Sequence, residues 1–292
     1  MTVPAHPLVK GFYDERTGSI QYVVVDPKTR ACAIIDPVLD YDEKSGSTAT
    51  RHADAILAYI EAENLSLVWI LDTHPHADHF SAATYLNEKT GARTAIGADV
   101  VKVQALWRKL YNMPDLAGDG SQWDRLFADG ERFLIGEMEV EVIHSPGHTL
   151  ASITYLVGDA AFIHDTLFMP DSGSARADFP GGSAETLWSS IEKILALPDE
   201  TRLFTGHDYC PDGREPLWES TVAEQKAKNI HLQGSGADFI AARKERDATL
   251  PFPKLLLHAL QVNLNAGALP EPEDDGCRYL KIPLNAFPDV SW

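Results

Sequence analysis

The chain has 292 residues, of which 44% are hydrophobic and 23% charged, so it is long enough for one large α/β domain or two small ones. Its 25 basic and 43 acidic residues give a formal charge of −18, which argues against a nucleic-acid-binding surface, because such surfaces need clustered lysine and arginine. The three cysteines, Cys32, Cys210 and Cys277, are not close in sequence and argue against a disulfide framework.

The N-terminal segment and the hydropathy of the chain bear on where the protein resides. Met1 to Lys10 contains no apolar signal-peptide core, and no run approaches the roughly 18 apolar residues of a spanning helix. We therefore expect a cytoplasmic protein without membrane contact.

The N-terminal third predicts strands that alternate with helices. Runs that are β-rich or continuously apolar predict strands at 20–25, 31–35 and 67–71. Apolar residues at helical spacing predict helices at 51–64 and about 81–90, the second closed by Gly91. The polar segment from Asp72 to His79 lies between the last of these strands and the second helix.

The middle third repeats this order, and polar segments again follow the strands. Strands are predicted at 137–143, 153–157, 160–163 and 203–205, and a helix at 184–196. Gly158-Asp159 predicts a hairpin between the second and third of these strands. The segments that follow strands carry His148, Asp165 and His207, at positions where a rigid scaffold commonly presents functional groups.

Two successive units of strands followed by a helix predict a layered α/β fold, with two packed sheets and helices outside them. We expect residues 1–232 to form the catalytic domain. Residues 233–292 contain Pro-rich and apolar stretches and are interpreted as a C-terminal extension packed on the same domain. Alternatively, this extension covers the cleft or forms a dimer contact.

The strongest chemical signal is the motif His74-x-His76-x-Asp78-His79. Its nitrogen and carboxylate donors suit zinc or iron better than calcium or magnesium, which prefer oxygen ligands. A polar loop with chance histidines is the alternative, but the chain has only 11 histidines. A metal site also needs ligands from distant parts of the chain. Taken singly, His148 or His207 is more often an ordinary polar residue than a ligand, but together with the motif both become strong candidates, as does Asp165.

These motifs, with Asp165-Thr-Leu-Phe and Gly-His207-Asp-Tyr209, resemble the metallo-β-lactamase superfamily from about residue 11 to 229. The resemblance implies an αββα four-layer sandwich and, in the pattern of glyoxalase II, two metal ions. The first ion would be held by His74, His76 and His148. The second would be held by Asp78, His79 and His207, with Asp165 bridging the two ions.

The loop from Gly173 to Gly182 and the tail segments at 246–255, 261–263 and 279–284 resemble bacterial persulfide dioxygenases instead. These enzymes are sulfur dioxygenases related to the mitochondrial ethylmalonic-encephalopathy protein. This resemblance implies one Fe(II) ion per chain, held by His74, His148 and Asp165 with three positions left open. The remaining four donors would surround that centre. The implied substrates are glutathione persulfide and O2, and the implied products are sulfite and glutathione.

Three further residues are candidates for catalytic roles. Arg176 and Asp178 are expected to form an ion pair that anchors the 173–182 loop, with or without a substrate contact. Tyr209 is expected to donate a hydrogen bond into the metal pocket, or else to be a packed aromatic residue. Cys210 is interpreted as a buried inert thiol rather than a reactive one. Relatives are often dimers, so a homodimer is expected.

Two other functions compete with the dioxygenase. All seven donors of the dinuclear pattern are present, so a two-zinc hydrolase that acts on a thioester such as S-lactoylglutathione is the main alternative. A non-enzymatic accessory protein that binds a persulfide for a regulator is the third hypothesis. A sensing role would favour a close cysteine pair, which this chain lacks.

Overall fold

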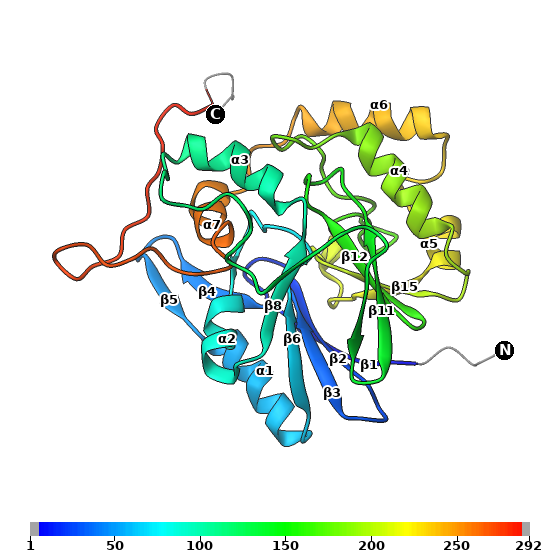
Figure 1. The fold of residues 1–292 in the computed structure, drawn as a ribbon. Coiled ribbons are helices and arrows are strands. Elements are labelled where there is room, and N and C mark those ends of the chain that lie inside the picture. Colours follow the sequence, from blue (N-terminus) through cyan, green and yellow to red (C-terminus); the bar gives the residue numbers. More distant parts are fainter. Residues whose placement is uncertain (1–5, 288–292) are drawn as a thin grey trace.

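The structure is a computed structural model. In it, two six-stranded sheets lie face to face with helices outside them (Figure 1). It describes residues 6–287, so half of the N-terminal segment analysed above and the last five residues of the extension lie outside it. The first sheet contains, in spatial order, β1 (Leu8–Tyr13), β2 (Ile20–Val25), β3 (Ala31–Ile35), β6 (Ser66–Leu71), β8 (Arg93–Gly97) and β9 (Arg125–Phe127). The predicted α/β four-layer fold is confirmed.

The second sheet contains the strands that precede the later candidate residues His148, Asp165 and His207. Its spatial order is β10 (Arg132–Ile135), β11 (Met138–His144), β12 (Ile153–Val157), β13 (Ala160–His164), β14 (Arg202–Thr205) and β15 (Glu219–Thr221). A small third sheet contains β5 (Ser47–Ala49), β4 (Val38–Asp42) and β7 (Phe80–Ser81). β12 and β13 form the predicted hairpin, in which Val157 pairs with Ala160.

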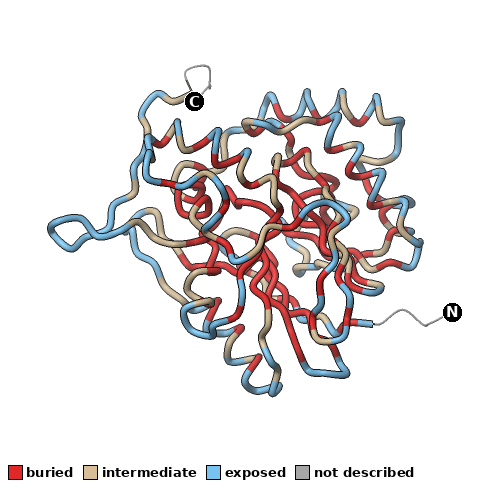
Figure 2. The backbone as a smooth tube through the Cα atoms, viewed as in Figure 1, coloured by how far each residue is buried: buried red, intermediate tan, exposed pale blue. Residues whose placement is uncertain are grey.

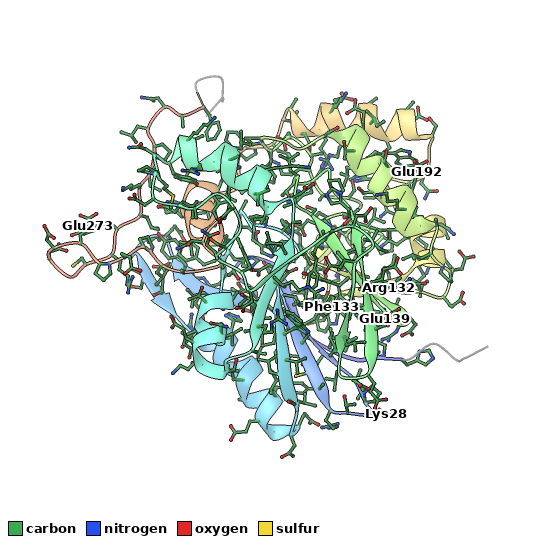
Figure 3. The ribbon with its side chains drawn as sticks, in the orientation of Figure 1. Lys28, Arg132, Phe133, Glu139, Glu192 and Glu273 are labelled. Atoms are coloured by element: carbon green, nitrogen blue, oxygen red, sulfur yellow. The ribbon has the colours of Figure 1, made fainter. Side chains whose placement is uncertain are left out.

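The inner faces of the two sheets form the main core, which appears as the buried strands at the centre of Figure 2. Tyr22 and Val24 of β2 face Tyr155 and Phe162 of the second sheet, whereas Val23 points to the opposite side. Every residue of β2 is buried because both faces of that sheet are covered. At the outer edge, Arg132 instead forms an ion pair with Glu139 while the adjacent Phe133 faces the core (Figure 3).

Helices cover both outer faces. The first sheet is covered by α1 (Arg51–Ala62) and α2 (Ala83–Thr90), and the second by α4 (Ala184–Leu195), α5 (Val222–Lys228) and α6 (Gly236–Asp247). α3 (Val100–Leu110) packs with α7 (Leu256–Asn263) through an apolar cluster that includes Trp107 and Leu260. None of the helices within residues 6–287 has the length and apolar character needed to cross a bilayer.

The predicted helices and strands are found with small shifts at their ends, and several elements were not predicted. α2 begins at Ala83 rather than near residue 81, because Phe80–Ser81 pairs with β4 as a short strand. The segment interpreted as an extension contributes α6, whose Phe239 ring lies 5.1 Å from that of Trp188 in α4, and α7. Both helices pack on the residues that precede them and lie beside the metal motif or the cleft described below.

Candidate metal centre

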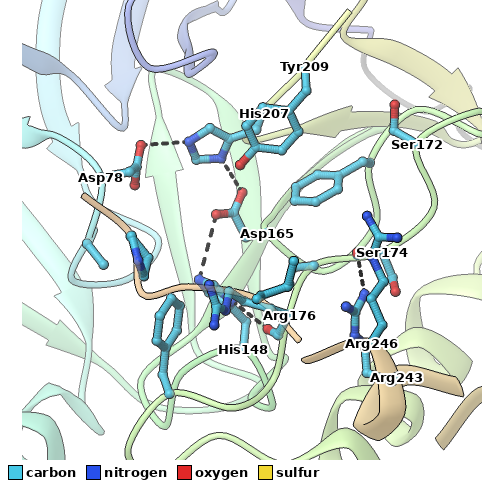
Figure 4. A pocket seen from close by; sticks show the side chains of 16 residues that line it. Asp78, His148, Asp165, Ser172, Ser174, Arg176, His207, Tyr209, Arg243 and Arg246 are labelled. Atoms are coloured by element: carbon cyan, nitrogen blue, oxygen red, sulfur yellow. Dashed lines mark hydrogen bonds and ion pairs between the residues drawn. The ribbon is translucent and has the colours of Figure 1, made fainter. Parts of the chain in front are cut away.

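The segments that carry candidate ligands meet at one end of the two facing sheets (Figure 4). The motif follows β6, and His148 lies in the loop that joins β11 to β12. β13 and β14 run parallel, so Asp165 and His207, which follow them, emerge at the same end.

A short hydrogen-bond chain orients His74. Asp36 accepts from the backbone N–H of Thr73 at 2.7 Å and from its hydroxyl at 2.8 Å. Because that hydroxyl donates to Asp36, it accepts from His74 Nδ1, 2.9 Å away, which places the proton of His74 on Nδ1. The buried Nε2 of His74 then carries a free lone pair, and it has no hydrogen-bond partner among residues 6–287.

His148 has the same tautomer for a similar reason. Its Nδ1 donates to the backbone carbonyl of Arg176 at 2.8 Å, which leaves the Nε2 lone pair free. Burial lowers the pKa of both His74 and His148 below the usual histidine value, and for His74 the neighbouring imidazoles lower it further. Both side chains are therefore neutral at pH 7, the form in which imidazole binds a metal.

Asp165 completes this group of three. Its Oδ2 lies 4.0 Å from His74 Nε2 and 3.7 Å from His148 Nε2, while its Oδ1 accepts from His207 Nδ1 at 2.6 Å. Burial opposes ionisation of Asp165, but the His207 imidazole outweighs it and lowers the pKa to about 2. A Cβ at Gly206 would lie 2.5 Å from Asp165 Oδ1, so glycine there makes room for this carboxylate.

The three free donor atoms fit one transition-metal ion. Ligand atoms about 2.0–2.2 Å from a shared ion lie roughly 3–4 Å apart, and the three atoms here are within 4.8 Å of one another. Two imidazoles and one carboxylate are the donor set of ferrous oxygenases. The structure thus brings together His74, His148 and Asp165, which the resemblance assigns to iron.

The other four candidate donors contact protein groups, although His76 and His79 also keep buried ring nitrogens without a hydrogen-bond partner among residues 6–287. His207 Nε2 lies 2.7 Å from Asp78 Oδ2, and His79 Nδ1 lies 3.0 Å from the same oxygen. His76 Nε2 lies 3.0 Å from Asp36 Oδ1. Burial opposes a charge on His76, but the Asp36 carboxylate outweighs it and raises the pKa to about 9. Nevertheless, His76, Asp78 and His79 also have donor atoms within 4.8 Å of one another.

The loop of residues 173–182 is held in place from two sides. The guanidinium of Arg176 contacts Asp178 with two nitrogens, at 2.6 and 2.7 Å, and its third nitrogen donates to the Pro251 carbonyl at 2.7 Å. The backbone N–H of Ala177 donates to Asp247 of α6 at 2.9 Å. Since every guanidinium nitrogen of Arg176 has a protein acceptor, its side chain positions the loop while its carbonyl orients His148.

A cavity of about 340 Å³ opens beside the three donors, a volume typical of small-molecule sites. Its wall contains residues of the metal cluster, of the 173–182 loop and of the C-terminal segment: Ala77, Asp78, His148, Asp165, Phe168, Ser172, Ser174, Ala175, Arg176, Phe179, His207, Tyr209, Arg243, Arg246, Leu250 and Pro253. The Tyr209 ring stacks on that of His207 with an interplanar angle of 11° (Figure 4). Cys210 does not line this cavity, and its thiol lies 3.5 Å from the Tyr13 hydroxyl.

Several residues that shape the site belong to no recognisable sequence motif. Asn263 of α7 donates to the backbone carbonyls of His76 and His79, at 2.8 and 2.7 Å, and accepts from the Ser81 N–H at 2.8 Å. Arg246 lines the cavity as an exposed cation. The position of Asp36 could have been noticed in the sequence, because this aspartate directly follows a buried strand. The metal motif also follows a buried strand.

The chain matches the family described as the metallo-beta-lactamase superfamily over residues 16–207. It is 67% identical over 287 residues to the beta-lactamase hydrolase-like protein of Xylella fastidiosa (strain Temecula1); the alignment covers 98% of this chain and 67%, or about two thirds, of that protein's length. It is 47% identical over 282 residues to glyoxylase B2 of Dictyostelium discoideum, covering 95% of this chain and 97% of the relative.

Two further relatives carry the name ETHE1. The mitochondrial persulfide dioxygenase ETHE1 of Mus musculus is 29% identical over 268 residues, with 91% of each chain covered. The crystal structure of ETHE1 from Myxococcus xanthus matches with a TM-score of 0.72 and 30% identity, and the match covers 89% of this chain and all of that one. The superfamily predicted from the motifs is therefore confirmed, whereas these relatives carry different names: a hydrolase-like protein, a glyoxylase and a persulfide dioxygenase.

Proposed function

This chain belongs to the metallo-beta-lactamase superfamily, and from that premise we propose that it is a persulfide dioxygenase with one Fe(II) ion. The reaction converts glutathione persulfide, O2 and water into glutathione, sulfite and two protons. The superfamily fold alone does not select this reaction, so the proposal depends on the donors and the cavity.

One observation carries the proposal: both ring nitrogens of His207 are engaged by carboxylates. His207 Nδ1 contacts Asp165 Oδ1, the oxygen that a bridging role would direct at a second ion, and Nε2 contacts Asp78. These contacts favour a single ion bound by two histidines and one carboxylate. Iron in such a site supplies redox chemistry with open coordination positions, which zinc does not.

The residues around the ion have separable roles in this proposal. His74 and His148 are held as neutral donors by Thr73 and by the Arg176 carbonyl. Phe168, Phe179 and Leu250 provide apolar wall that limits water around the reacting sulfur. Tyr209 lines the cavity, and in this proposal its hydroxyl donates a hydrogen bond to the persulfide.

The mouth of the cavity suits an anionic substrate although the chain as a whole is acidic. Arg246 and the buried Arg243 both lie in its wall, on α6 (Figure 4). Glutathione carries two carboxylates, and a cation at a cleft reverses the local field of a chain with charge −18. A glutathione-borne persulfide is therefore the substrate that we propose.

Protein purified without oxygen tests the proposal through its metal content and its oxygen uptake. We expect about one iron per chain and O2 consumption with glutathione persulfide that yields sulfite. His148→Ala and Asp165→Ala should lose the iron, because each removes one of three ligands, whereas His207→Ala should retain most of it. His52→Ala, outside the cluster, is the matched histidine control.

The second candidate is a two-zinc thioester hydrolase. It is favoured by the proximity of the donor atoms of His76, Asp78 and His79, and by the name of one relative, the beta-lactamase hydrolase-like protein. About two zinc ions per chain, thioester cleavage without O2 uptake, and equal metal loss in all three cluster variants would establish it instead.

A further inference from the structure

Ser19, the residue immediately before β2, lies inside the group of side chains that the dinuclear pattern assigns to a second metal ion. Its hydroxyl oxygen is 3.0 Å from Asp78 Oδ2, 3.1 Å from His79 Nδ1 and 3.0 Å from His207 Nε2. We propose that this hydroxyl occupies the position of the second ion and thereby limits the centre to one metal. The inference rests on the one-ion centre of the proposed function and explains how the chain maintains it.

The geometry of the cluster sets the Ser19 hydroxyl in competition with an ion. Each ring nitrogen has a single in-plane direction for a proton or lone pair. His207 Nε2 faces Ser19 Oγ at 3.0 Å and Asp78 Oδ2 at 2.7 Å, and His79 Nδ1 faces the same two oxygens, whereas the buried His79 Nε2 has no hydrogen-bond partner among residues 6–287. Ser19 Oγ is 3.0 Å from both His207 Nε2 and Asp78 Oδ2, so an ion bound to those two atoms would compete with the hydroxyl for the same space.

The hydroxyl is fixed by its surroundings and cannot easily turn away. Ser19 is 2% exposed and pairs with His207 in an isolated antiparallel β-bridge. Its carbonyl accepts from the Asp14 N–H at 2.9 Å, and the next residue, Ile20, donates to the Gly206 carbonyl at 2.8 Å. The Thr17 hydroxyl donates to Ser19 Oγ at 2.7 Å. Removal of this one oxygen is therefore the smallest change that opens the position.

Zinc stoichiometry measures the effect without any assay of turnover. Metal-free wild type and variants are equilibrated with excess zinc, freed of unbound metal, and analysed for zinc per folded chain. We expect about one zinc in the wild type and about two in Ser19→Ala. The conservative variant Ser19→Thr keeps a hydroxyl and should remain at one. Ser145→Ala, which removes a buried hydroxyl 3.0 Å from His164 Nε2, is the matched control and should also remain at one.

Ser19→Gly provides a second test if the alanine variant is not folded by circular dichroism. One zinc in the wild type and still one in each Ser19 variant that folds would overturn the role of Ser19 while leaving the one-ion centre intact. Two zinc ions already in the wild type would overturn this inference and the one-ion centre together. Manganese loading followed by electron paramagnetic resonance gives an independent readout, because two adjacent ions in Ser19→Ala should show magnetic coupling.

Discussion

The ion pair between Arg243 and Asp247 offers a quantitative test of how the 173–182 loop is held. The two side chains, one helical turn apart on α6, are 3% and 5% exposed, and Nη2 and Oδ1 are 2.5 Å apart. Asp247 also accepts the backbone N–H of Ala177 in the 173–182 loop. Asp247→Asn keeps an oxygen acceptor for that N–H but leaves the buried guanidinium without a counter-charge.

The expected cost follows from the burial of both groups. Removal of one partner of a buried ion pair costs about 3–5 kcal/mol, mainly because the remaining charge is uncompensated. With a urea m-value of about 3 kcal/mol/M, reasonable for a chain of this size, the midpoint of unfolding should fall by roughly 1–1.7 M. Because a neutral amide oxygen accepts the Ala177 N–H less strongly than a carboxylate does, the loop is held less firmly, and KM for the persulfide should also rise with metal content unchanged.

Urea denaturation followed by circular dichroism measures this difference. The double variant Arg243→Met/Asp247→Asn removes both charges and should recover most of the lost stability. A loss below about 0.5 kcal/mol in Asp247→Asn would refute the reasoning. So would a double variant whose loss equals the sum of the two single losses, since independent contributions mean that the pair is not coupled.

Three other predictions concern the cavity and the pH dependence of stability. Tyr209→Phe should lower kcat by about tenfold with iron content unchanged, because it removes one hydrogen bond to the reacting group; steady-state oxygen uptake checks this. Arg246→Ala should raise KM for glutathione persulfide about three- to tenfold, and the difference from wild type should shrink at high ionic strength, as measured in a salt series. Burial opposes ionisation of Asp40, but hydrogen bonds from His52 hold the pKa of its carboxyl below the usual value. The stability that ionised Asp40 contributes is therefore present above about pH 3.9, the pKa of an aspartate in the unfolded chain. This stability is lost as the pH falls through the lower pKa of the folded protein. The difference in Tm between wild type and Asp40→Asn should therefore narrow as the pH falls below about 3.9, as followed by thermal melts.

Local composition is sufficient to predict the strands of the central layers. All residues of β2 and β3 are buried, and continuous apolar runs are typical of strands that are covered on both faces. α3 was not predicted because its sequence mixes apolar and long polar residues. Gln104, for example, is buried with its amide fully engaged, and one of its three partners is the Leu264 carbonyl, 160 residues away.

The metal motif could be found from residue types and order, but the groups that decide how it is used could not. Ser19 and Asp36 are ordinary polar residues in sequence. They acquire their roles only because β2 begins and β3 ends beside the metal motif in the folded chain. Whether a histidine faces an ion or a carboxylate is a property of the assembled site, so the motif left one-ion and two-ion centres open.

The amide of Asn263 has a consequence for how the protein matures. It joins the backbone of the metal motif to a helix 184–187 residues further along the chain. During synthesis the motif therefore leaves the ribosome long before Asn263 does, and contacts of such long sequence separation form late. Insertion of the ion into a finished centre must accordingly wait until nearly the entire polypeptide has emerged.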